Sequence, residues 1–134
     1  MIFGRKKYLD ELIAGRGNGL VKIITGVRRC GKSFLLFDIW HNWLLENGVT
    51  DSHIIEIQLD DFRNRRLRKP DALLDYIDSK VVDESNPYYV VLDEVQLVEE
   101  FVEVILSLTH MRNVDVYVSG SNSRFLSSDV VTEF

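Results

Sequence analysis

The chain has 134 residues, of which 46% are hydrophobic and 28% charged, and its formal net charge is -5. This length suits one domain with a single sizeable core, and the composition is that of an ordinary soluble globular protein. No apolar run is long enough to span a bilayer, the first residues lack the apolar segment of a secretory signal, and the single cysteine excludes a disulfide framework or a cysteine zinc site. We therefore expect a cytoplasmic protein that has no contact with a membrane.

The predicted helices and strands alternate along the chain. In order, the residue pattern predicts a helix over 5–14, a strand over 20–24, a helix over 33–46, a strand over 53–59 and a basic polar loop over 63–69. The second half is predicted to hold a helix from Pro70 to about 82, a doubly buried strand over 88–92, a helix over 97–110, a strand over 114–118 and the start of a helix within 122–128. Asn47-Gly48 is expected to cap the second helix in a left-handed conformation. This alternation predicts an α/β domain with a mainly parallel sheet.

The first predicted strand and the second predicted helix are joined by a run that matches G-x-x-x-x-G-K-[ST]. Its glycines allow backbone N–H groups to turn inward around an anion, and the positive end of the following helix adds to this attraction. Lys32 can reach the β- and γ-phosphates of a nucleotide, and the Ser33 hydroxyl can bind Mg²⁺. The candidate nucleotide-binding residues are therefore Gly26, Val27, Arg28, Arg29, Cys30, Gly31, Lys32, Ser33 and Phe34.

Charge is distributed in a way that fits such a loop. Residues 1–33 carry eight Lys and Arg against two Asp and Glu, whereas residues 34–134 carry eight against nineteen. A basic segment suits a polyanion such as phosphate, and a solvated basic face is the alternative. The acidic remainder argues against a broad nucleic-acid surface, so DNA or RNA is a conceivable client for the basic run 63–69 but is not indicated. Within the loop, Arg28 and Arg29 either contact phosphate or point to solvent, and Cys30 is either a small packing residue or a reactive thiol.

Two acids follow the apolar strand over 88–92. In a phosphate-loop protein, Asp93 would hold Mg²⁺ and Glu94 would act as the general base toward the attacking water. Such a base is expected of a nucleotide hydrolase, whereas a small-molecule kinase does not need one. The guanine-reading pattern N-K-x-D is absent from the sequence, so ATP is the expected nucleotide.

Small polar residues follow the fourth predicted strand. If that strand lies beside the phosphate-loop strand, one of these side chains sits near the γ-phosphate and can orient the attacking water. Asn122 is the first candidate for this catalytic role, with Lys32 and Glu94 as the other catalytic residues, and Ser121 and Ser119 rank after Asn122. The alternative is a helix cap without contact to the nucleotide.

Three blocks of residues, 23–33, 92–96 and 119–123, resemble the AAA-domain family of prokaryotic P-loop ATPases in the AAA+ superfamily. The lead-in 7–12 is also similar to that family, whose members usually continue into a C-terminal domain of unknown function. The resemblance implies a three-layer α/β/α P-loop NTPase fold, ATP and Mg²⁺ as ligands, and a sensor-1 role for the segment 119–123. By position alone, Gln96 is a further polar group near the site.

The length of the chain departs from that family. In the superfamily's strand order, the phosphate-loop strand lies between the fourth strand and a fifth strand. We therefore expect residues 1–134 to be the N-terminal part of an ATPase domain with about four strands, without the fifth strand and the C-terminal domain. The uncovered edge of the strand over 20–24 then favours self-association. ATP hydrolysis is the main functional prediction, a nucleotide-binding module without turnover is the alternative, and a P-loop small-molecule kinase ranks third.

Overall fold

The structure is a computed structural model that describes residues 5–25, 35–83 and 85–120. Its centre is a parallel sheet of four strands in the order β1-β4-β3-β2. The strands are β1 (Lys22–Thr25), β2 (Ile54–Gln58), β3 (Tyr88–Asp93) and β4 (Val114–Gly120). The predicted α/β class, parallel sheet and number of strands are confirmed within these residues.

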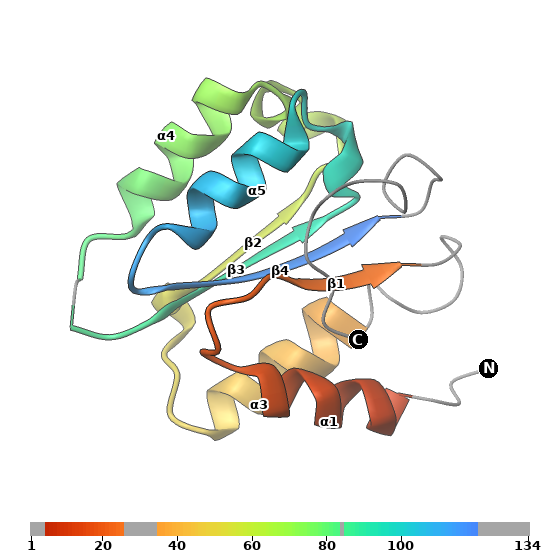
Figure 1. Ribbon diagram of the computed structural model, residues 1–134, viewed down its shortest axis with the longest axis vertical. Coiled ribbons are helices and arrows are strands. Elements are labelled where there is room, and N and C mark those ends of the chain that lie inside the picture. Colours follow the sequence, from red (N-terminus) through yellow and green to blue (C-terminus); the bar gives the residue numbers. More distant parts are fainter. Residues whose placement is uncertain (1–4, 26–34, 84, 121–134) are drawn as a thin grey trace.

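Helices cover both faces of the sheet, which gives three layers (Figure 1). One face carries α1 (Arg5–Gly15), the π-helical turn η1 (Leu35–Trp40) and α3 (His41–Glu46). The other face carries α4 (Pro70–Lys80) and α5 (Phe101–Thr109). Because parallel strands need crossovers that pass over the sheet, this arrangement follows directly from the alternation of strands and helices.

The central strand β3 shows why both faces must be covered. All six of its residues are buried. Tyr88, Val90 and Leu92 pack in the core beneath α4 and α5, whereas Tyr89 and Val91 pack in the core beneath α1 and α3. Since successive side chains of a strand point to opposite faces, a run that is apolar at every position requires a core on each side. The prediction of a doubly buried strand is therefore confirmed.

Several predicted boundaries are also confirmed. Gly48 follows α3 with φ +94°, which is the left-handed conformation expected after a helix end. Pro70 lies in the first turn of α4, where its missing N–H leaves no hydrogen bond unmade. Strand β1 has β4 as its neighbour and is an edge of the described sheet. The pairing of that edge with a fifth strand or a second chain stays a prediction.

Three predictions need correction. The basic segment expected to be a loop forms the short 3-10 helix η3 (Phe62–Arg68), because the Asp61 side chain accepts a hydrogen bond from the Arg63 N–H and starts the turn. The helix expected over 97–110 begins at Phe101, and the 3-10 turn η4 (Val95–Leu97) precedes it. Strand β4 continues to Gly120, two residues beyond its expected end. The expected helix within 122–128 lies outside the described residues.

Candidate functional site

The carboxyl ends of three adjacent strands meet at one edge of the sheet. Thr25 at the end of β1 lies beside Gly120 at the end of β4, and Leu92 of β3 lies beside Val118 of β4. Strand β3 then ends in Asp93, so the acid pair follows at the same edge at which β1 ends. In open parallel sheets, ligands bind outside this edge.

Part of the predicted site lies outside the described residues. This holds for the whole loop Gly26–Phe34, including Lys32 and Ser33, and for Ser121 and Asn122. The loop nonetheless begins directly after Thr25, the last residue of β1. The described part of the site is therefore the acid pair and its immediate partners.

The two acids are buried at the end of β3. Asp93 and Glu94 are each 3% exposed. Glu94 adopts the left-handed conformation, with φ 57° and ψ 49°, immediately after the strand ends. A residue with a Cβ atom is destabilised in this conformation by roughly 1–2 kcal/mol, and such backbone strain is concentrated at functional positions. The sharp turn lets the chain leave the sheet directly after Asp93, so both carboxylates stay at its edge.

Ser119 links the two acids across the sheet. Its hydroxyl donates a hydrogen bond to Asp93 Oδ1 and accepts one from the backbone N–H of Glu94, at 3.0 Å. The side chain of Ser119 is fully buried on β4. Of the three polar residues predicted at the end of the fourth strand, Ser119 ranked last, yet the structure brings it to the acid pair. Its hydroxyl thereby fixes one oxygen of Asp93 and the start of the turn at Glu94.

Gln96, which the sequence placed near the site by position alone, contacts the carboxylate of Glu94. Its Nε2 donates a hydrogen bond to Glu94 Oε1 at 2.8 Å. Gln96 is 9% exposed, and its Oε1 has no hydrogen-bond partner among the residues that the structure describes. The left-handed turn at Glu94 and the 3-10 turn after it bring the two side chains together. The general-base candidate is thus held at its backbone by Ser119 and at its carboxylate by Gln96.

The described residues fit Mg²⁺ as part of a ligand set. Asp93 supplies carboxylate oxygens, which Mg²⁺ prefers, and it ends β3 at the edge of the sheet where β1 also ends. Within the described ranges, no group of three or more His, Cys, Asp or Glu could hold a metal ion by itself.

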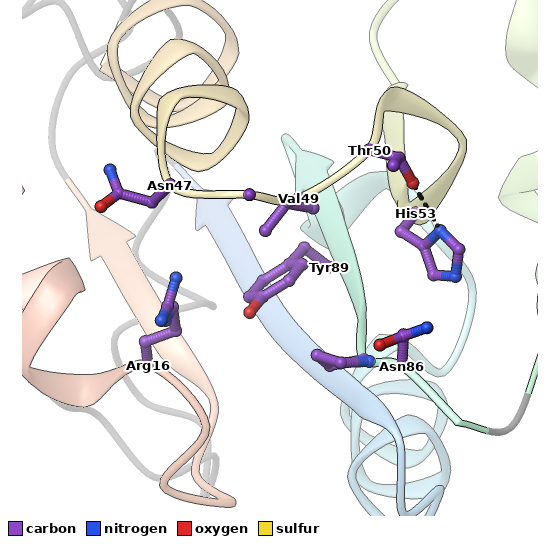
Figure 2. Close-up of a pocket in the computed structure, with 9 residues that line it drawn as sticks. Arg16, Asn47, Val49, Thr50, His53, Asn86 and Tyr89 are labelled. Atoms are coloured by element: carbon purple, nitrogen blue, oxygen red, sulfur yellow. Dashed lines mark hydrogen bonds between the residues drawn. The ribbon is translucent and has the colours of Figure 1, made fainter.

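A pocket of about 320 Å³ lies at the opposite end of the sheet (Figure 2). Arg16, Val49 and Asn86 are among its lining residues, and the buried Tyr89 ring lies between them. These residues precede the strands or stand at their first positions, whereas Asp93 ends β3. The pocket is therefore separate from the acid pair.

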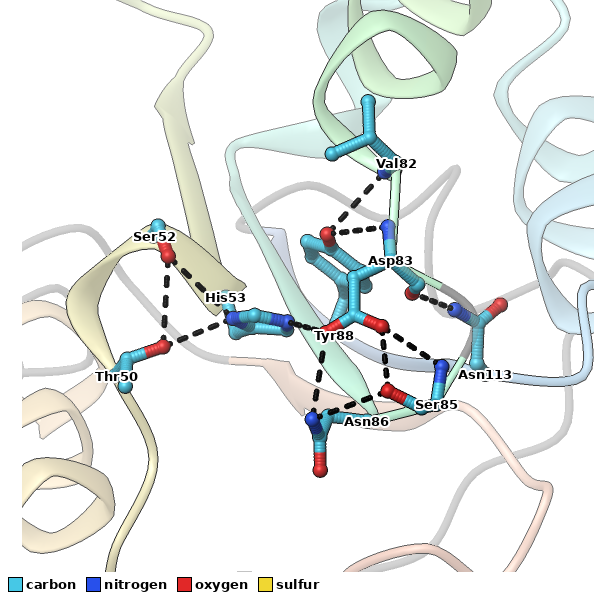
Figure 3. Close-up of polar contacts among 9 residues, drawn as sticks. All are labelled: Thr50, Ser52, His53, Val82, Asp83, Ser85, Asn86, Tyr88 and Asn113. Carbon is cyan, nitrogen blue, oxygen red and sulfur yellow. Dashed lines mark hydrogen bonds and ion pairs between the residues drawn. The ribbon is translucent and has the colours of Figure 1, made fainter.

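A polar network closes the same amino-terminal end (Figure 3). The Tyr88 hydroxyl accepts hydrogen bonds from the N–H groups of Val82 and Asp83, at 3.2 and 3.0 Å. The Asp83 carboxylate contacts His53 Nε2 at 3.2 Å and accepts a hydrogen bond from the Ser85 hydroxyl. The two hydrogen bonds from Ser85 lower the pKa of Asp83 most, and together with those from Asn86 and His53 they hold it well below its usual range. This network joins the residue before β2, the first residue of β3 and the segment that follows α4, so its role is structural.

Charged groups also meet beside α3. His41 Nδ1 lies 2.8 Å from Glu56 Oε2, and His41 Nε2 lies 3.0 Å from Asp51 Oδ1. Burial lowers the pKa of His41, but the hydrogen bonds and charges of the two carboxylates outweigh burial and raise it. Burial raises the pKa of Glu56 despite the opposing effect of His41. The contact of His41 with Glu56 therefore fastens the start of α3 to the outer strand β2.

None of the helices within the described ranges has both the length and the apolar character that a membrane crossing requires. A family model described as "AAA domain" matches residues 18–134. Among curated proteins, an uncharacterized protein of Haemophilus influenzae is 28% identical over 131 residues, which are 98% of this chain and 32% of that protein. An uncharacterized protein of Methanocaldococcus jannaschii is 27% identical over 116 residues, which are 84% of this chain and 23% of that protein. The chain thus spans less than a third of the length of these relatives.

Two solved structures share the fold. The structure of Drosophila ORC bound to AT-rich DNA and Cdc6 matches with a TM-score of 0.59 and 12% identity over 96% of this chain and 50% of the matched chain. The structure of Caenorhabditis elegans PCH-2 matches with a TM-score of 0.54 and 21% identity, over 87% of this chain and 35% of that one. At these identities the similarity concerns the arrangement of helices and strands.

Proposed function

Because this chain belongs to the AAA domain family, whose model matches residues 18–134, we propose that it binds Mg-ATP and hydrolyses it. The observation that carries the proposal is the buried pair Asp93 and Glu94, tied together by Ser119 at the edge where β1 leads into the loop Gly26–Ser33. Burying two adjacent carboxylates is costly for folding alone. A cationic ligand at that edge gives the pair a function.

Each proposed role follows from the chemistry of the side chain. The backbone N–H groups and Lys32 of the loop bind the phosphates, and Ser33 and Asp93 hold Mg²⁺. The metal ion, when bound, supplies positive charge that neutralises the phosphate oxygens. Glu94 accepts the proton of the attacking water, because its carboxylate is buried next to the metal-binding acid. The segment 119–123, with Asn122 as the first candidate, orients that water.

Binding and turnover can be separated in one set of experiments. We expect Mg-ATP to raise the melting temperature, because a ligand that binds only the native state stabilises it by roughly 2.7 kcal/mol at a hundred times its dissociation constant. Lys32→Ala removes the shift, since the phosphates lose their cation. Glu94→Gln retains the shift and lowers ATP hydrolysis, measured as phosphate release, to a small residual rate.

The outcomes discriminate between the candidate functions. No shift at millimolar Mg-ATP for the unmodified chain would reject nucleotide binding. A shift without phosphate release would favour the alternative, a nucleotide-binding module without turnover. Full turnover by Glu94→Gln would reject Glu94 as the base. The activity of the longer relatives, their clients and any nucleic-acid partner are further questions, because this chain spans only 32% and 23% of the two curated relatives.

A further inference from the structure

Gln96 contacts the carboxylate of Glu94, the proposed general base. Its Nε2 lies 2.8 Å from Glu94 Oε1, and both side chains are buried. The two residues are two positions apart, a spacing at which side chains of a regular helix do not face each other. They meet because Glu94 is left-handed and Val95–Leu97 form a 3-10 turn. The backbone conformation that strains Glu94 is thus the one that brings Gln96 to it.

The chemistry of the pair determines the orientation of the amide. A general base must be deprotonated, and a deprotonated carboxylate only accepts hydrogen bonds, so in the proposed role the NH₂ group of Gln96 faces Glu94 and the amide oxygen points away from it. In that orientation, Oε1 has no donor among the described residues. A buried acceptor without a donor destabilises a fold, and an apolar side chain of similar size would pack at lower cost. Packing therefore does not account for an amide at this position.

We propose that Gln96 is a positioning residue that holds the Glu94 carboxylate in the orientation from which it accepts the proton of the attacking water. The inference rests on the proposed ATP hydrolysis and names a further residue for it. Ser119 restrains Glu94 at its backbone N–H, but the carboxylate lies beyond three rotatable bonds. The hydrogen bond from Gln96 restrains the far end of that side chain. Its free Oε1 is an acceptor to which a water molecule beside Glu94 can donate.

Gln96→Met tests the proposal, because methionine keeps the length and volume of glutamine and removes the amide. We expect the single-turnover rate of ATP hydrolysis to fall on the order of 10- to 100-fold, as reacting groups that are misplaced by about 1 Å lose up to that factor. The dissociation constant of Mg-ATP should stay within about twofold, since Gln96 restrains the base and not the nucleotide. Leu106→Met is the control for introducing a methionine away from the site, because Leu106 is exposed on α5.

A double-mutant comparison separates positioning from a general structural effect. In a Glu94→Gln chain, Gln96→Met should leave the residual rate unchanged, because the base that it orients is already lost. A further loss in that background would show a structural role and overturn the proposal. If the unmodified chain hydrolyses ATP and the Gln96→Met variant does so at the same rate, the role of Gln96 is overturned and the proposed function stays intact. An unmodified chain without ATP hydrolysis would overturn both.

Discussion

Replacing Ser119 by alanine removes only one oxygen atom, but it should destabilise the protein strongly. The hydroxyl is fully buried, donates to the Asp93 carboxylate and accepts from the Glu94 N–H at 3.0 Å. A hydrogen bond to a charged group contributes about 1.5–3 kcal/mol and one between neutral groups about 0.5–1.5 kcal/mol. We therefore expect Ser119→Ala to lower the free energy of unfolding by about 2–4 kcal/mol.

Urea denaturation followed by circular dichroism measures this change. With a slope of about 2 kcal/mol per molar urea, the midpoint should fall by about 1–2 M. Ser107→Ala is the matched control, because Ser107 is exposed on α5 and its replacement should change stability by less than about 0.5 kcal/mol. If the two variants unfold at the same urea concentration, the link between Ser119 and the acid pair contributes nothing to stability and the reasoning fails.

Two further predictions concern charged groups away from the acid pair. The raised pKa of His41 means that its contribution to stability is fully present below the ordinary value of 6.5 and is lost as pH rises through the folded-state value. The difference in unfolding free energy between the unmodified chain and His41→Gln should therefore be largest near pH 5 and vanish in alkaline solution, and a difference that grows with pH would contradict this. Asp115 forms a buried ion pair with Lys22, at 2.6 Å, and also accepts a hydrogen bond from the Tyr117 hydroxyl. Asp115→Ala should lower the free energy of unfolding by about 3–5 kcal/mol, because it leaves the Lys22 ammonium buried without this carboxylate. Adding Lys22→Met to that variant should restore part of the lost stability. Urea denaturation of both variants measures this, and a double variant no more stable than Asp115→Ala would contradict the prediction.

The architecture was predictable because the main signals are local. The run of apolar residues in β3 can only be accommodated between two cores, and the alternation of strands with helices demands parallel pairing. The start of α5 was not predictable from apolar spacing. Leu97 continues the pattern of Phe101 and Ile105, but it is 38% exposed, because left-handed residues at Glu94 and Glu100 interrupt the helix. The spacing of apolar residues contains no information on the left-handed backbone of Glu94 and Glu100, so it could not show where the helix begins.

The position of the acid pair at the end of a buried strand was predictable, whereas its contacts were not. Asp93 and Glu94 were expected from their place after a buried strand. The importance of Ser119 depends on cross-strand register, since Leu92 lies beside Val118 and the next residues of both strands meet at the edge. Register is a property of pairing between distant segments, which the local pattern around Ser119 does not contain. The amide of Gln96 reaches Glu94 only because of the turn between them, so its contact was equally hidden.

Strand order has a consequence for how the chain is made on the ribosome. Strand β1 is the first of the four strands to be synthesised, but its neighbour in the described sheet is β4, and the ion-paired residues Lys22 and Asp115 lie 93 positions apart. Closing so long a loop carries a large entropic cost until the intervening elements have folded. During translation, β1 therefore waits for β4, the last described strand, before it can take its place in the sheet, and the described carboxyl edge is assembled after β4 has emerged.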